Sequence, residues 1–113
     1  MTANEIDGLV AEELRSIADP DRRAALSSLL VEPQRHLRSW AYGPGKFECW
    51  TVARDDSRAT VLIYSRGAFA DPWGFVACDS DDLGMDSQWF STLDDAFIGG
   101  LWRGPLPPDY EVS

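Results

Sequence analysis

The residues best suited to chemistry in this sequence are aspartates that gather between the third predicted strand and the first turn of the last predicted helix. Carboxylates can hold a cation, exchange a proton or attract a basic surface. Tryptophans stand near this cluster, and an aromatic ring beside carboxylates suits the grip of an arginine or lysine side chain. We therefore predict a partner-binding surface with these members: Asp79, Asp81, Asp82, Asp86, Asp94, Asp95, Trp73 and Trp89.

The spacing of the loop aspartates does not match a calcium loop. Asp79, Asp81 and Gly84 fall at the first, third and sixth positions of an EF-hand loop. Leu83 and Phe90 then occupy the fifth and twelfth positions, where an oxygen ligand and a bidentate glutamate are needed. The sequence also lacks a glycine-rich phosphate loop and the cysteine spacing of a zinc site. We expect no metal site and no cofactor.

Nucleophilic catalysis needs a thiol or hydroxyl with a base beside it. His36 is the only histidine, and Cys49 and Cys78 are the only thiols. No flanking motif pairs these residues. We interpret both cysteines as reduced and largely buried, because free cysteine packs as a small hydrophobic residue. The chain is predicted not to be an enzyme.

The charge of the chain is unevenly divided. Residues 1–66 carry ten acidic and nine basic residues, a net of −1, whereas residues 67–113 carry nine acidic residues and Arg103, a net of −8. Such a field attracts basic surfaces and repels phosphates and anionic lipids. The charge therefore predicts a basic protein as partner, and neither nucleic acid nor a membrane. The alternative is that the acidity serves solubility alone.

The spacing of apolar residues and the positions of capping residues predict three helices. Apolar residues recur at helical spacing from Ile6 to Ile17, with Asn4 as the predicted N-cap. Asp19-Pro20 starts a second helix, which Pro33 ends or bends. Ser91-Thr92 starts a third helix, in which Gly99-Gly100 predicts either close packing or an early end.

Three segments rich in aromatic and β-branched residues are predicted strands: 47–53, 60–65 and 73–78. We predict one α+β domain over residues 1–113, because this length supports a single core. It has two N-terminal helices, a three-stranded or slightly larger antiparallel sheet, and a C-terminal helix packed on the sheet. Its predicted parts are a helical part at 1–39, sheet plus helix at 40–103, and an extended tail at 104–113.

Residues 40–98 resemble a group of small bacterial proteins with no established activity. The matching pieces are Trp40-Ala41-Tyr42-Gly43, Cys49-Trp50-Thr51-Val52, Pro72-Trp73-Gly74, Gly84-Met85-Asp86-Ser87-Gln88-Trp89-Phe90 and Thr92-Leu93-Asp94-Asp95-Ala96-Phe97. The resemblance implies a bacterial origin and a compact fold, and it brings no functional residues with it.

Together these observations predict a small acidic binding module, an inhibitor, immunity-type protein or adaptor, that engages a basic partner through the acidic face of residues 71–95. The N-terminus lacks the basic-then-apolar layout of a secretory signal, so we expect a cytoplasmic location, where a reducing environment disfavours a disulfide. One alternative is a small enzyme or ligand-binding domain with its site near Trp73, Asp86 and Trp89. Another is a housekeeping domain whose acidity serves solubility only. The oligomeric state stays open.

Overall fold

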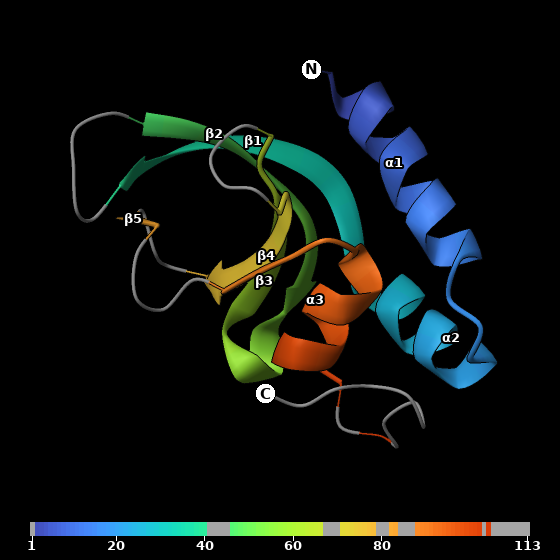
Figure 1. Ribbon diagram of the computed structural model, residues 1–113. Coiled ribbons are helices and arrows are strands. Elements are labelled where there is room, and N and C mark those ends of the chain that lie inside the picture. Colours follow the sequence, from blue (N-terminus) through green and yellow to red (C-terminus); the bar gives the residue numbers. More distant parts are fainter. Residues whose placement is uncertain are drawn as a thin grey trace.

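The computed structural model describes residues 2–40, 46–66, 71–78, 82–83, 88–102 and 104. Its helices and strands follow one another along the chain as shown in Figure 1. They are α1 (Ala3–Arg15), α2 (Pro20–Leu29), β1 (Leu30–Trp40), β2 (Lys46–Asp55), the 3-10 turn η1 (Asp56–Arg58), β3 (Thr60–Tyr64), β4 (Trp73–Ala77), β5 (Asp82–Leu83), β6 (Gln88–Phe90) and α3 (Leu93–Gly100).

The strands form one sheet in the order β5-β1-β2-β3-β4-β6. The strands β1, β2, β3, β4 and β6 pair antiparallel, and the two-residue strand β5 pairs in parallel with the end of β1. The predicted strands at 47–53, 60–65 and 73–78 correspond to β2, β3 and β4, which lie side by side. The α+β class is confirmed, but the sheet extends beyond the predicted strands by β1, β5 and β6.

The prediction of a helical part at 1–39 is wrong for residues 30–39, which belong to β1. The helix α2 ends at Leu29 because Leu30 is extended, with φ −63° and ψ 140°. Pro33 follows shortly and has no N–H group for a helical hydrogen bond. The rest of the segment pairs with β2. A long-range pairing therefore decides the structure of a sequence that suits a helix or a strand locally.

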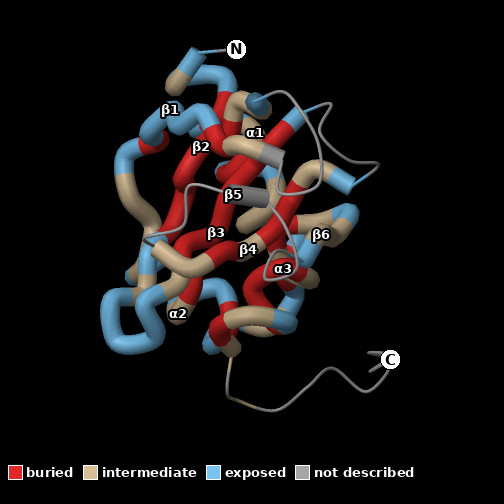
Figure 2. Tube along the Cα trace, turned by 90° about the vertical axis from the view of Figure 1, so that its left-hand side faces the viewer, coloured by how far each residue is buried: buried red, intermediate tan, exposed pale blue. Residues whose placement is uncertain are grey.

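Helices cover one face of the curved sheet, and each face of the sheet buries its own cluster (Figures 1 and 2). The larger cluster joins all three helices to the facing side chains of the sheet, with Ile6, Leu26, Leu62 and Phe97 among its buried members. The second cluster lies on the other face and buries Cys49, Val61, Ile63 and Val76. The central strands are therefore buried on both faces, as the apolar runs in their sequences indicate.

Each helix begins at a side chain that accepts a hydrogen bond from the first turn. Thr2 caps α1, in place of the predicted Asn4, and it forms a capping box with Glu5. Asp19 caps α2, as predicted. Thr92 caps α3, where the sequence predicts a hydroxyl cap within Ser91-Thr92. Short-range sequence signals thus determine where these helices start.

The helix α3 lies close to the sheet because it ends in two glycines. A Cβ atom at Gly99 would lie 2.8 Å from the ring of Phe90, and one at Gly100 would lie 2.9 Å from the ring of Phe75. These two rings stack with their centroids 6.0 Å apart. The glycine pair therefore serves close packing, which is one of the two predicted outcomes.

Candidate functional site

The predicted contact surface lies only partly within the described residues. Three of its aspartates lie outside them: Asp79, Asp81 and Asp86. Asp82 begins β5, but its side chain is also outside the described part. β5 forms the edge of the sheet at β1, whereas α3, which carries Asp94 and Asp95, contacts β4 and β6 at the other edge. Elements at opposite edges of the sheet therefore carry these aspartates.

The two tryptophans of the predicted surface lie on opposite faces of the sheet. Trp73 pairs with Phe90 and Gly74 pairs with Trp89, and neighbouring residues of a strand point to opposite faces. Trp73 faces the helices and is 4% exposed. Trp89 is half-buried on the other face, against Gly74. The prediction that Trp73 is a surface contact is therefore wrong, because its indole ring fills the core.

Asp94 is bound within the protein. Its carboxylate oxygens accept hydrogen bonds from Arg22, from Nε at 2.7 Å and from Nη2 at 2.9 Å. Arg22 is 6% exposed, and its hydrogen bonding to Asp94 raises the pKa of the guanidinium. Asp95 is half-buried and makes no ion pair with another described residue. Of the two helix aspartates, only Asp95 is available to a partner.

Cys49 is a structural thiol. His36 is its register partner on β1, but the thiol of Cys49 donates to the carbonyl oxygen of Phe47 at 3.7 Å. Burial raises the pKa of Cys49, so the thiol stays protonated at neutral pH. Cys78 is also a free thiol, and it is half-buried where the prediction has it largely buried.

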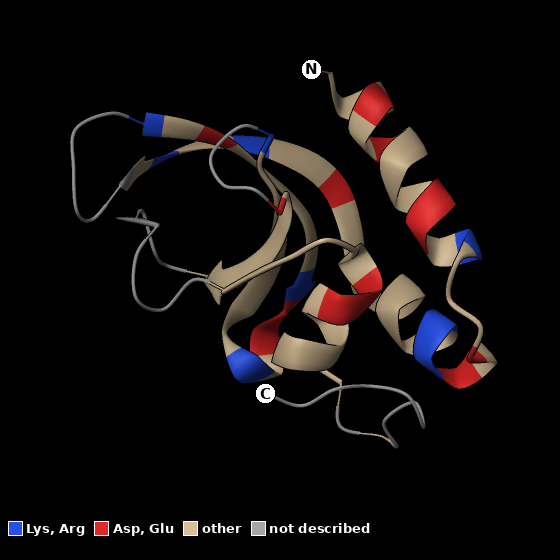
Figure 3. Cartoon of the chain, in the orientation of Figure 1, with Lys and Arg blue, Asp and Glu red and all other residues tan. Residues whose placement is uncertain are grey.

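Exposed carboxylates concentrate on α1 (Figure 3). Asp7 and Glu12 are exposed and make no ion pair with any described residue, and Glu5 is exposed at the N-terminal end. The basic residue of this helix is Arg15, in its last turn. In the described part of the sheet and in the turn η1, by contrast, arginines pair with acidic residues: Arg35–Glu48, Arg54–Asp56 and Arg58–Asp55. The exposed surface of α1 is therefore acidic.

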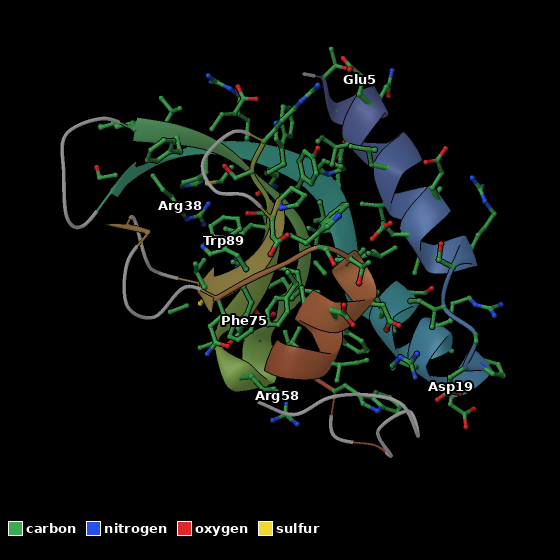
Figure 4. All side chains as sticks on the ribbon, in the orientation of Figure 1. Glu5, Asp19, Arg38, Arg58, Phe75 and Trp89 are labelled. Carbon is green, nitrogen blue, oxygen red and sulfur yellow. The ribbon has the colours of Figure 1, made fainter. Side chains whose placement is uncertain are left out.

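A pocket of about 610 Å³ opens between α1 and the C-terminal end of β3. This volume lies within the range of roughly 300–1,000 Å³ that is common for small-ligand sites. The residues that line it are Glu5, Gly8, Leu9, Glu12, Tyr64 and Arg66. The helical members share one face of α1, because residues three and four apart are neighbours on a helix. Figure 4 shows Glu5 at the N-terminal end of α1, where it forms part of the rim.

The two sides of the pocket carry opposite charges. Glu5 and Glu12 lie on the α1 side, and Arg66 follows β3 on the other side. Arg66 is exposed and makes no ion pair with a described residue. Leu9 and Tyr64 supply apolar surface between these charges. The arrangement can bind a group that carries both a cation and an anion.

Aromatic packing fixes the sheet side of the pocket. Tyr64 contacts Trp73 edge to face, with ring centroids 4.7 Å apart, and its register partner on β2 is Trp50. Trp50 Nε1 donates to Glu48 Oε1 at 3.0 Å, and Arg35 Nε donates to Glu48 Oε2 at 2.5 Å. The bond from Arg35 and then that from Trp50 hold the pKa of Glu48 below its ordinary value. These contacts hold the ring of Tyr64 in a fixed position in the pocket lining.

Sequence reasoning missed this pocket because its two walls come from distant parts of the chain. One local signal was present. Glu5, Gly8 and Glu12 fall on one helical face, with a glycine between two acids. Only the fold places Arg66 opposite that face.

The described residues contain no group of three or more histidine, cysteine, aspartate or glutamate side chains that could hold a metal ion. Within the same part of the chain, no helix has the length and apolarity needed to cross a membrane. Comparisons with protein-family models, curated proteins and solved structures found no match.

Proposed function

We propose that this chain is a cytoplasmic protein-binding module, an inhibitor, immunity-type protein or adaptor, that engages a basic partner. The observation that carries this proposal is the acidic exposed surface of α1, where Glu5 and Glu12 lie beside the pocket and Asp7 lies on the other flank of the helix. The net charge of the whole chain, −9, has the same sign as the charge of this surface. Opposite charges on two surfaces speed their association and select among partners.

The acids of α1 are only partly explained by the stability of the helix. Glu5 completes the capping box. Glu12 lies in the last turn, where the helix dipole disfavours a negative charge. Asp7 and Glu12 also gain nothing from an ion pair with a described residue. Basic side chains of a partner would remove this repulsion on binding, which supports a binding role.

The loop carboxylates of Asp79, Asp81, Asp82 and Asp86 stay in the proposal as a second contact region. Their sequence places them in the half of the chain that carries −8. The alternative site near Trp73, Asp86 and Trp89 is not supported, because Trp73 is buried beneath the helices.

Two double variants with equal changes of charge test the proposal. Asp7→Asn with Glu12→Gln removes two acids from α1. Asp21→Asn with Glu32→Gln removes, from α2 and β1, two exposed acids that make no ion pair with a described residue. The probe is a short peptide of alternating arginine and glycine. We expect the α1 variant to bind it at least about fivefold more weakly than the parent, and the control variant to change by less than about twofold.

Salt and the loop variant complete the test. Raising the salt from about 20 mM to about 200 mM should weaken parent binding, because screening shortens the reach of exposed charges. Equal losses in the two double variants would show that net charge alone matters, which leaves solubility as the role of the acids.

A variant with asparagine at positions 79, 81, 82 and 86 measures the second region. If it alone loses binding, the loop and not α1 is the contact surface.

A further inference from the structure

We infer that the pocket between α1 and β3 is a subsite for a basic residue that also carries a free α-carboxylate, namely an arginine or lysine at the C-terminus of a partner polypeptide. This inference rests on the proposed function, because it names the part of the basic partner that enters the protein. It is carried by the charges of the pocket and by the glycine in its wall.

The charges of the pocket match such a residue. A segment with basic side chains alone would be attracted by the two glutamates but repelled by cationic Arg66, which also lines the pocket. A C-terminal arginine or lysine supplies a cation for Glu5 and Glu12 and a carboxylate for Arg66, whose guanidinium can bind it through two parallel hydrogen bonds. The two glutamates lie about 10 Å apart along the helix axis, given a rise of about 1.5 Å per residue. The aliphatic stem of the guest would lie against Leu9 and Tyr64.

Gly8 lies between the two glutamates and faces open space. Apart from its two chain neighbours and the adjacent backbone of α1, no heavy atom of the described residues lies within 4 Å of the position that its Cβ atom would occupy. A glycine in the interior of a helix costs about 1 kcal/mol relative to alanine. The described structure therefore contains no packing reason for this costly residue.

Other glycines of the protein do have such a reason. A Cβ atom would lie 2.6 Å from the backbone oxygen of Gln88 at Gly74, 2.8 Å from a ring atom at Gly99 and 2.9 Å from one at Gly100. Gly8 differs from these three in that only the pocket lies before it. Room for a guest against the α1 backbone accounts for this glycine.

The experiment compares ligands that share the cation and differ in the carboxylate. The tripeptide Ala-Ala-Arg with a free carboxylate is titrated against its C-terminal amide, against Ala-Ala-Gln and against free L-arginine. Binding is followed by the shift of the backbone amide signal of Leu9, a lining residue that every variant retains, in NMR spectra. We expect the free-acid tripeptide to bind at least about fivefold more tightly than each of the others. The amide lacks the carboxylate, Ala-Ala-Gln lacks the side-chain cation, and free L-arginine carries an α-ammonium group that would lie close to cationic Arg66.

Two variants locate the binding. Gly8→Leu fills the pocket without changing a charge, and Ala24→Leu adds the same side chain at an exposed position of α2. We expect Gly8→Leu to abolish binding of Ala-Ala-Arg and Ala24→Leu to leave it within about twofold of the parent. The replacement Arg66→Gln should make the free acid and the amide bind equally. Thermal melts check that the Gly8→Leu variant remains folded, which its higher helix propensity favours.

Each contrary result has its own meaning. Unchanged binding in a folded Gly8→Leu variant overturns the pocket, and equal binding of acid and amide by the parent overturns the role of the carboxylate. Free L-arginine binding as tightly as the tripeptide overturns the polypeptide terminus as the occupant. The arginine–glycine peptide, made with glycine at its C-terminus, separates these failures from a failure of the proposed function, because its binding draws also on Asp7, which does not line the pocket.

Discussion

Arg22 on α2 and Asp94 on α3 form a two-point ion pair at the start of α3, with N–O distances of 2.7 and 2.9 Å. Beside it, Glu13 Oε1 on α1 accepts a hydrogen bond from the backbone N–H of Leu93 at 2.6 Å. The first turn of α3 is thus bound by both N-terminal helices. These contacts also satisfy N–H groups and charges that would otherwise be costly to bury.

Replacing Asp94 with asparagine should destabilise the protein by about 2–3 kcal/mol, because the buried guanidinium of Arg22 then keeps only its longer contact with Asp19, at 3.5 Å. The control is Asp95→Asn, which removes the neighbouring charge where no ion pair with a described residue exists. It should cost less than about 1 kcal/mol, the scale of a charge at a helix terminus. Urea unfolding at neutral pH measures both. Equal losses would contradict the structural role of the pair.

Glu48 should make part of the stability depend on acid pH. The bonds from Arg35 and Trp50 lower its folded-state pKa below the ordinary value of 4.5. Its contribution is therefore fully present well above pH 4.5 and is lost as the pH falls through the folded-state pKa. We expect the Glu48→Gln variant to lose less stability than the parent between neutral pH and that range. Parallel pH profiles of the free energy of unfolding would contradict this.

The same substitution should have opposite effects at two glycines. Gly8→Ala should stabilise the protein by up to about 1 kcal/mol, because it adds helix propensity in open space. Gly100→Ala should destabilise it by about 1–3 kcal/mol, because the new methyl group meets the ring of Phe75. Thermal unfolding of the two variants gives the signs directly. A stabilising Gly100→Ala would show that α3 can move away from the sheet at little cost.

The two thiols should react at different rates. Cys49 is fully buried, whereas Cys78 is half-buried. Under native conditions a thiol reagent should modify Cys78 first, and the Cys78→Ser variant should resist labelling until the protein unfolds. Mass spectrometry of a time course distinguishes the sites. Rapid labelling of Cys49 would show that its face of the sheet opens readily.

The elements that follow local patterns were predictable from the sequence. The central strands β2, β3 and β4 are rich in apolar residues, and capping signals mark Asp19 and Thr92 as helix starts. β1 was missed because its sequence suits a helix as well as a strand until its pairing with β2 is known. β6 was missed because its three residues are too few to show a period.

The candidate site was harder to predict for a physical reason. Trp73 and Trp89 flank the same loop in sequence, but the alternation of a sheet sends their side chains to opposite faces. Asp94 has the composition of a surface residue, and only a partner 72 positions earlier shows that it is bound. The pocket depends on Arg66 lying opposite α1, which no local pattern encodes.

The ion pair and the hydrogen bond that hold the start of α3 also affect how the protein folds during synthesis. They join residues separated by 72 and 80 positions, and contacts of such long range slow folding. During synthesis, α1, α2 and the strands leave the ribosome before the side chains of Leu93, Ala96 and Phe97 that complete their core. The nascent chain therefore keeps apolar surface exposed until these three residues have left the ribosome. A premature stop shortly before Leu93 would leave an aggregation-prone product, although most of the sheet had already been synthesised.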